Sequence, residues 1–473
     1  MRPKISPKLA KVLTFSLVFL EILSNSKSTL ASDLLLVGGG WEYPATGDPY
    51  GISMYDKVVE LGGNGDPSQA VIRIFTTASS SKKSAMKNGE LWVQDFVDLY
   101  AQKYPDLTPD VEWIPFHIGN CNNIKNKSNS NVINAILAAN SIIFGGGDQS
   151  LITKCFFNEN PATQTKTTTP VFDALASKFN NEDIIIAGTS AGTAVQTSSP
   201  MITEGESYEA LLEKPIPLID TPPFARELYY NPLGGLGFFP YGITDTHFSA
   251  RGRQGRLIRL AAETDVKMAF GVDENTGLLI TNLETSTPEM EVMGEEGVTV
   301  FDLSNAEIKD STDYFSIENV SVTYLTQGDR FDPNTKTVLF PTKNPLICSS
   351  PEIPATSNDI FSHLSPSGNR KNPSEFVKVA TSLFESCQNT TQGLSFENKP
   401  IFQVTMTQNQ VLGSQAYLGI DAQGNSSTSY VNLQVDIQAF EPPQTVPESN
   451  LTFGLLGIGF LAITIKRQQQ FSN

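Results

Sequence analysis

Short apolar runs alternate with amphipathic stretches over residues 33–190, and this alternation restricts the fold more than any other feature of the chain. The first run, residues 34–37, stops at three glycines, as a buried strand does when it enters a tight loop. Further runs occupy residues 70–75, 111–116, 141–144 and 184–187. Strands that alternate with helices need crossover connections. The sequence therefore predicts an α/β fold with a mostly parallel sheet covered by helices on both faces.

The pattern changes after about residue 280, where strand-like segments replace the strand–helix alternation. Such segments lie at residues 298–301, 320–325, 402–407, 416–419 and 430–437, with one helical stretch at 376–384. We therefore expect a main domain over residues 32–340. A small β-rich C-terminal appendage follows over residues 341–440, and its role is unknown.

Both ends of the chain resemble targeting segments. Residues 1–31 hold a basic start, a short apolar stretch and a small-residue exit at Ala31, which predicts a cleaved secretory signal peptide. An amphipathic first helix is the alternative. Residues 441–473 contain a Pro-rich linker, then Pro447-Glu448, then an apolar run at 451–465 and a basic pair. That run has 15 residues, against about 20 for a comfortable membrane span.

This C-terminal layout is similar to the PEP-CTERM sorting signal of exported bacterial proteins. The resemblance implies an exosortase-like processing enzyme as a partner, and a plain tail anchor is the alternative. We therefore expect an exported, extracellular or cell-surface protein, possessing a membrane tether if the segment is retained. Export permits disulfides, and four cysteines allow three pairings. Proximity in the sequence favours Cys121–Cys155 and Cys348–Cys387.

The numbers of charged residues, histidines and cysteines disfavour some partners and some kinds of site. With 33 basic and 50 acidic residues the formal charge is −17, which disfavours nucleic-acid binding because phosphate contacts need surplus Lys and Arg. The chain has only three histidines and no Cys-x-x-Cys pair, so a multi-histidine zinc site is not expected. We expect no metal and no organic cofactor.

The motif Gly-Thr-Ser-Ala-Gly at residues 188–192 is the clearest indication of chemistry. It follows the apolar run 184–187 directly and precedes a helix-compatible stretch. This setting is typical of a nucleophile elbow, in which a sharp turn exposes the hydroxyl of the serine, here Ser190. The N–H of Ala191 would then face developing negative charge. A structural Gly-rich turn is the alternative interpretation.

A second glycine-rich loop, at residues 145–149, also follows an apolar run. Its backbone N–H groups at Gly146 and Gly147 suit the remaining donors of an oxyanion hole. Gln149 is a candidate for binding a substrate carboxylate or amide. An ordinary tight loop remains an alternative for this segment.

The base for a serine nucleophile is expected among three histidines, His117, His247 and His363. His247 stands out because Asp245 precedes it and three arginines follow it within nine residues: Arg251, Arg253 and Arg256. Arginine forks bind carboxylates in a bidentate manner, so this cluster indicates an acidic substrate, although a solvated basic face is the alternative. Further along, Asp273 or Glu274 can supply the acid that orients the imidazole.

These motifs taken together resemble those of the cyanophycinases. The matching segments are the Thr-Thr-Ala-Ser-Ser end of residues 70–80, the Gly-Gly-Gly-Asp-Gln loop, Gly-Thr-Ser-Ala-Gly, residues 245–256 and 271–276, and the later Gly-Asp-Arg-Phe-Asp. The resemblance covers roughly residues 33–340. It implies the flavodoxin-like fold shared with aspartyl dipeptidase and the class I glutamine amidotransferases. One departure is Thr246, where the family often has Gln.

The resemblance implies Ser190 as nucleophile, His247 as base and Glu274 as third member of a catalytic triad. It places substrate contacts on Gln149, Asp245, Arg251, Arg253 and Arg256, with cyanophycin or a related β-aspartyl peptide as substrate. A homodimer is one candidate assembly. Two alternatives stay open: an α/β-hydrolase-type esterase that uses Ser190, Asp329 and His363, and an inactive surface binding protein on the same fold.

Overall fold

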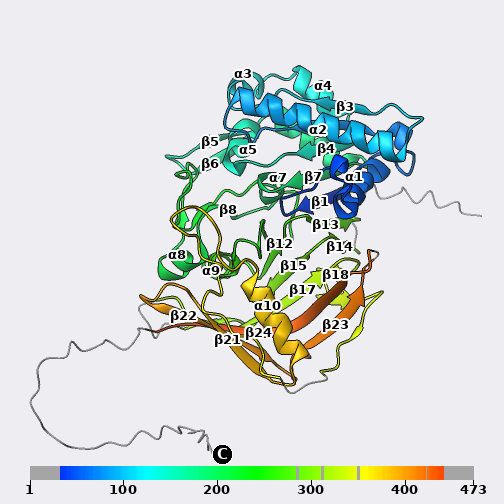
Figure 1. The fold of residues 1–473 in the computed structure, drawn as a ribbon. Helices are drawn as coiled ribbons and strands as arrows, with labels where there is room; N and C mark the ends of the chain where they lie inside the picture. Colours follow the sequence, from blue (N-terminus) through cyan, green and yellow to red (C-terminus); the bar gives the residue numbers. More distant parts are fainter. Residues whose placement is uncertain (1–31, 284–286, 310–313, 349–351, 422, 441–473) are drawn as a thin grey trace, which may run out of the picture.

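The computed structural model describes residues 32–283, 287–309, 314–348, 352–421 and 423–440. The predicted signal peptide and sorting segment lie outside these residues. Among the residues described, no helix has the length and apolar character needed to span a bilayer. Two large sheets dominate the chain, and the helices between residues 49 and 181 lie around the first of them (Figure 1).

The first sheet has nine strands in the order β19-β18-β14-β13-β1-β7-β4-β2-β3. The neighbours from β1 to β3 are parallel, and the strands on the other side of β1 are antiparallel. The predicted α/β class with a parallel-rich sheet is therefore confirmed. The strands are β1 (Asp33–Val37), β2 (Val71–Phe75), β3 (Asp110–Trp113), β4 (Ser141–Phe144), β7 (Ile185–Thr189), β13 (Thr276–Thr281), β14 (Glu289–Gly294), β18 (Arg330–Asp332) and β19 (Thr337–Leu339).

Helices bury both faces of the parallel part, which explains the uninterrupted apolar runs. Along β1, Leu35 and Val37 pack with α1 and α2, whereas Leu34 and Leu36 belong to the core on the other face with α4, α5 and α6. Local signals start these helices; Ser81, for example, forms a capping box at the start of α2. The helices are α1 (Pro49–Gly62), α2 (Lys82–Lys103), α3 (Cys121–Ile124), α4 (Asn131–Ala138), α5 (Gln149–Phe156), α6 (Pro170–Asn181) and α7 (Ala191–Ala194).

The second sheet continues across residue 340. Its main path is β11-β12-β15-β17-β24-β22-β21, and β23 pairs with β24. The β-rich C-terminal region is thus built onto β17, and α10 packs on its strands (Figure 1, yellow to red). The elements are β11 (Ile243–Asp245), β12 (Met268–Val272), β15 (Gly297–Asp302), β17 (Ile317–Thr326), α10 (Glu375–Glu385), β21 (Thr390–Leu394), β22 (Ile401–Gln408), β23 (Gln415–Ile420) and β24 (Ser426–Phe440).

Shorter elements connect the two sheets or lie at their margins. A three-stranded sheet of β8, β10 and β9 and the helices α8 and α9 lie between residues 201 and 263. The short elements are β5 (Phe157–Asn160), β6 (Thr165–Thr168), β8 (Met201–Glu204), α8 (Ser207–Leu212), β9 (Ile216–Pro217), β10 (Tyr229–Asn231), α9 (Gln254–Glu263), β16 (Glu307–Ile308) and β20 (Asn344–Pro345), with 3₁₀ turns at Pro44–Thr46 and Pro67–Gln69.

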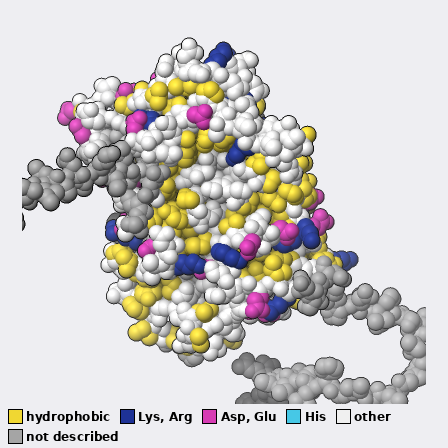
Figure 2. Space-filling model, turned by 180° about the vertical axis from the view of Figure 1, so that it is seen from behind, with side chains coloured by type: hydrophobic (Ala, Val, Ile, Leu, Met, Phe, Trp, Pro, Cys, Tyr) yellow, Lys and Arg dark blue, Asp and Glu magenta, His cyan; other side chains and the backbone are white. Residues whose placement is uncertain are grey.

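The surface seen from behind carries both signs of charge. Basic and acidic side chains lie interspersed in a band across its lower half, with apolar side chains between them (Figure 2). Several of the chain's exposed charges are paired, as Arg330 is with Glu289 and Glu291. Interspersed pairs of this kind contribute little to stability individually.

Both predicted disulfides are present, Cys121–Cys155 and Cys348–Cys387. The first joins α3 to α5 across 34 residues, and both cysteines are fully buried. A crosslink that closes a loop of this length removes chain entropy worth about 4 kcal/mol from the unfolded state. We expect the Cys121→Ala/Cys155→Ala protein to lose about that much unfolding free energy in a denaturant titration. Excess reductant should remove most of the difference, and equal stability of the oxidised proteins would contradict the prediction.

Candidate active site

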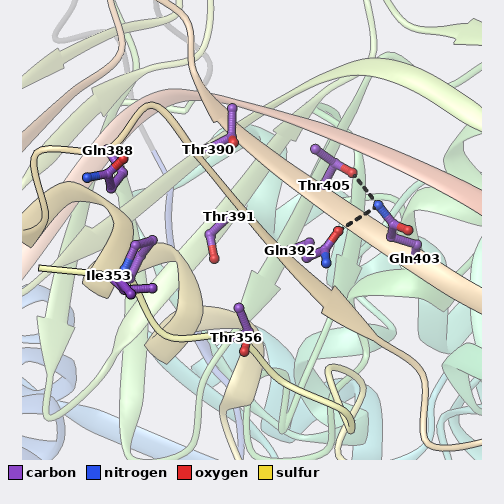
Figure 3. Close-up of a pocket in the computed structure, with 9 residues that line it drawn as sticks. Ile353, Thr356, Gln388, Thr390, Thr391, Gln392, Gln403 and Thr405 are labelled. Carbon is purple, nitrogen blue, oxygen red and sulfur yellow. Dashed lines mark hydrogen bonds between the residues drawn. The ribbon is translucent and has the colours of Figure 1, made fainter. Parts of the chain in front are cut away.

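Two of the cavities in the part of the chain that the structure describes differ clearly in the chemistry they offer. One, of about 420 Å³, lies over β21 and β22, where Gln403 Nε2 donates to Gln392 Oε1 and Thr405 Oγ1 (Figure 3). Its lining contains no titratable side chain. The other, of about 630 Å³, is lined by Ser190, His247 and the three arginines of the 245–256 segment. Only the second offers a nucleophile with a base.

Ser190 occupies the sharp turn between β7 and α7. Its φ of +53° is rare for a residue with a side chain and is the strained conformation of a nucleophile elbow. The two flanking glycines make the turn sterically feasible. A Cβ on Gly188 would lie 2.2 Å from the Gly192 carbonyl oxygen, and one on Gly192 would lie 2.0 Å from that of Phe144. The motif is therefore a steric requirement of this strand–turn–helix crossing.

Three side chains that are distant in the sequence meet at this turn. His247 Nε2 lies 2.8 Å from Ser190 Oγ, and His247 Nδ1 lies 2.6 Å from Glu274 Oε1. His247 follows β11 and Glu274 follows β12, and these two strands are parallel neighbours. Both residues consequently emerge at the same sheet edge. The sequence left Asp273 and Glu274 open as the acid, and the structure brings Glu274 to the imidazole.

Asp273 has a different, structural position. It is fully buried, and its carboxylate accepts hydrogen bonds from the Ser249 N–H and the Tyr324 hydroxyl at 2.7 and 3.0 Å. Burial raises the pKa of Asp273 to about 6. Its contact with Ser249 ties β12 to the loop after His247.

The glycine loop at residues 38–40 also shapes the site, a role that its sequence alone did not reveal. The His247 N–H donates to the Gly38 carbonyl at 2.6 Å, and the Asn275 N–H donates to that of Gly39 at 2.8 Å. Gly39 has φ +107°, and a Cβ there would lie 2.2 Å from His247 Cε1. The imidazole thus rests against bare backbone. The run of three glycines was the available signal in the sequence, but it did not indicate that the His247 imidazole would pack against this loop.

The protonation states favour a neutral imidazole beside a carboxylate. Burial lowers the pKa of His247, and the nearby Arg251 and Arg253 lower it further, whereas the hydrogen bond to Glu274 raises it. The hydrogen bond from His247 lowers the pKa of Glu274, and the arginines act in the same direction. At neutral pH His247 can therefore accept a proton from Ser190 while Glu274 holds the opposite ring nitrogen.

The candidate oxyanion donors surround the serine. Gly146, Gly147 and Ala191 all line the cavity with Ser190. Their backbone N–H groups have no acceptor within the described part of the chain. A Cβ on Gly146 would lie 3.3 Å from Ser190 Cβ, so a larger residue would crowd the space beside the hydroxyl.

The predicted substrate contacts divide into two groups. Arg256 makes a bidentate pair with Asp245, through contacts of 2.6 and 2.8 Å, and donates to the Gly205 carbonyl. Arg253 donates to Asp245 and to the Thr246 carbonyl. Although burial favours the neutral acid, these arginines keep the pKa of Asp245 below its usual range. These three side chains thus line the cavity, but most of their hydrogen bonds and ion pairs are with one another.

Arg251 and Gln149 differ from that internal network. The guanidinium of Arg251 makes no hydrogen bond or ion pair with any residue that the structure describes, and it lines the cavity. Gln149 Nε2 donates to the carbonyls of Ile202 and Thr203 on β8, so the amide nitrogen expected to bind substrate is already used. Arg251 is therefore the predicted contact best placed for a substrate anion.

The alternative esterase triad is not assembled. Asp329 is buried and pairs with Lys343 at 2.7 Å. His363 pairs with Asp359 at 2.9 Å and stacks on Phe396. Neither side chain joins Ser190, whose hydroxyl contacts His247 instead. The order of Ser, Asp and His along the sequence was right for that triad, but the tertiary pairing is different.

Two further cavity residues, Glu204 and Phe224, were not among the sequence predictions. Glu204 ends β8, and its Oε1 accepts the Phe224 N–H at 3.2 Å. Phe224 has φ +60° and is 92% exposed at the edge of the cavity. An isolated exposed Phe after two prolines gave no reason to link it with residues 20 positions earlier.

Known proteins with a similar sequence include several cyanophycinases. No protein-family model matches the chain. Cyanophycinases from Trichormus variabilis and from a Nostoc species are each 27% identical over 283 residues, covering 59% of this chain and 80% of the relative. A cyanophycinase from Synechococcus elongatus is 29% identical over 202 residues, covering 42% and 54%.

A solved structure from Listeria monocytogenes, described as a peptidase E, covers 53% of this chain and 95% of its own. Its TM-score is 0.30 and its identity 12%, so the fold assignment here stands on the strand order above. The sequence similarities support a relationship of this chain to cyanophycinase-like hydrolases and, with it, a serine-peptidase-like function.

Proposed function

We propose that the protein is an exported serine peptidase that hydrolyses cyanophycin or related β-aspartyl peptides. The observation that carries this proposal is the hydrogen-bonded chain from Glu274 through His247 to Ser190 at a cavity of about 630 Å³. That volume suits a ligand of dipeptide size or a short segment of a polymer. The similarity to cyanophycinases supports the same substrate class.

The geometry fits acyl transfer through a covalent intermediate. The Ser190 hydroxyl donates to His247 Nε2, which accepts its proton as Ser190 Oγ attacks the substrate carbonyl. The imidazolium that forms is stabilised by Glu274 at Nδ1. His247 then returns the proton to the leaving amine, and water releases the acyl group by the reverse sequence. The N–H groups of Gly146, Gly147 and Ala191 would stabilise the oxyanion in both steps.

The charges in the cavity support a substrate that carries both signs. Arg251 offers an uncommitted cation for a carboxylate. Glu204 lines the same cavity, and its carboxylate forms no ion pair within the residues described. A β-aspartyl-arginine unit carries a free carboxylate and a guanidinium, and so complements both groups.

Export, processing by an exosortase-like enzyme and homodimerisation remain predictions from the sequence. The two disulfides support an oxidising location for the folded chain.

A substrate panel tests the proposal. The purified protein is offered cyanophycin, β-Asp-Arg, α-Asp-Arg and a simple carboxylic ester, and a fluorophosphonate probe is used to label the serine. We expect β-linked substrates to be cleaved first and the probe to modify Ser190. Cleavage of the ester alone would favour an esterase. Absence of both turnover and labelling would instead favour a binding protein on an inactive fold.

A further inference from the structure

A segment of the C-terminal region, residues 359–374, packs against the loop that carries Arg251. We call residues 249–252 the Arg251 loop; it begins two positions after His247. The Ser374 N–H donates to the Ser249 carbonyl at 3.0 Å. Gly252 has φ +59°, and a Cβ there would lie 2.0 Å from the Phe361 carbonyl oxygen. The two segments are therefore in direct backbone contact.

Arg370 is the main polar link between the segments. Its guanidinium makes a bidentate pair with Glu206, with contacts of 2.5 and 2.7 Å, and Nη1 also donates to the Arg251 carbonyl at 3.2 Å. The Arg370 and Glu206 side chains are 18% and 17% exposed. Planar bidentate pairing of this kind fixes geometry as well as charge.

The segment that presents Arg370 is itself held by internal hydrogen bonds. The buried carboxylate of Asp359 accepts from the His363 N–H, the His363 ring and Asn372 Nδ2. The Ser362 hydroxyl donates to the Asn372 carbonyl. Arg370 is thus held on a braced loop, and its position does not depend on the Arg251 loop alone.

Glu206 lies within electrostatic reach of the arginines of the site. It interacts with Arg370, Arg256 and Arg253, and it also acts on Arg251. Although burial favours its neutral form, Arg370 keeps the pKa of Glu206 below its usual value, so the carboxylate is charged. Without Arg370 this anion would keep only Arg253 and Arg256, which already pair with Asp245, and would attract the nearby Arg251 guanidinium more strongly. Arg251 is the nearby arginine whose guanidinium makes no hydrogen bond or ion pair among the described residues, although the charge of Glu274 also acts on it.

We propose that Arg370 is a positioning residue that keeps Arg251 available for substrate. Arg370 neutralises the Glu206 carboxylate. Its hydrogen bond to the Arg251 carbonyl also holds the Arg251 loop in place. The region after residue 340 would thereby complete the substrate cavity of the preceding domain. The effect on catalysis rests on the proposed function, since it assumes that Arg251 binds a substrate carboxylate.

Kinetics of Arg370→Ala on β-Asp-Arg test the proposal. We expect KM to rise about tenfold with kcat within about threefold of wild type, because a binding group is diverted while the triad stays intact. The decisive variant is Glu206→Gln/Arg370→Ala, which removes the competing anion and should recover most of the KM. A purely structural role predicts that the double variant is no better than the single one. Arg330→Ala, which breaks an ion pair on β14 and β18, is the matched control and should leave KM unchanged.

Hydrogen exchange separates this inference from the proposed function. In Arg370→Ala, amides of residues 249–253 should exchange faster than in wild type, while those of α4 remain unchanged. If wild-type protein cleaves no β-aspartyl peptide but this local change appears, the proposed function fails and the positioning contact stands. Unchanged exchange together with an unchanged KM would overturn the inference. Circular dichroism confirms that each variant is folded.

Discussion

The Ser190→Ala protein should lose about six orders of magnitude in kcat, down to the residual rate that binding and an oxyanion hole sustain. The reason is that, among the residues the structure describes, the hydroxyl whose oxygen lies 2.8 Å from His247 Nε2 is the group placed to form the acyl intermediate. The variant should fold normally, because the side chain is small and the strained backbone at φ +53° is compatible with alanine to the same extent as with serine. Turnover of β-Asp-Arg at saturating concentration measures the loss.

The matched control is Ser177→Ala, on the exposed side of α6, for which activity should equal that of wild type. Circular dichroism and the thermal midpoint of both variants should match the wild-type protein. Residual turnover within tenfold of wild type, with contaminating activity excluded by a second preparation, would remove Ser190 from the nucleophile's role.

Glu274→Gln should lower kcat by about 10³- to 10⁴-fold while leaving KM close to its wild-type value. The carboxylate lies 2.6 Å from His247 Nδ1, where it fixes the tautomer and compensates the charge of the imidazolium. An amide of the same size supplies no negative charge and can hold the wrong tautomer. Glu291→Gln, on β14, replaces an acid that pairs with Arg330 and is the matched control. A loss smaller than tenfold in Glu274→Gln would show that the acid does not act with His247.

The same variant should shift the pH profile. Burial lowers the pKa of His247, so in wild type the neutral base persists below the usual histidine value of about 6.5 and kcat/KM falls only at lower pH. Glu274 raises the pKa of His247 through its hydrogen bond. Loss of the Glu274 carboxylate should therefore move the acidic limb of the pH profile to still lower pH, because the His247 imidazole then binds a proton less tightly. A limb displaced to higher pH would contradict this assignment of the causes.

The parts of the site that could be predicted from sequence are those set by local geometry. The elbow at Ser190 needs glycines at fixed neighbouring positions, and strand–turn–helix order is readable from the apolar pattern. His247 stood out by its neighbours and the choice of Glu274 came from a motif resemblance; in the structure His247 contacts Ser190 and Glu274 contacts His247. The five parallel strands of the first sheet and the disulfide pairs were likewise accessible, whereas its antiparallel strands β13, β14, β18 and β19 were not predicted.

What escaped prediction depends on contacts between distant segments. The pairing of Asp245 with Arg253 and Arg256 changed three expected substrate contacts into a mostly internal network. The sequence shows that arginines are present, but it does not show with which carboxylate each arginine forms an ion pair. The packing of Gly39 on the His247 ring is equally non-local, since more than 200 residues separate them. The link from Arg370 to Glu206 spans 164 residues.

The position of β17 also bears on how the chain reaches its native state. This strand lies between β15 and β24, and β24 is the last strand that the structure describes. A nascent polypeptide that ended at residue 340 would leave the ten residues of β17 with an unsatisfied edge, open to pairing with another molecule. The second sheet is completed only when the final strand arrives, and such long-range pairing is slow.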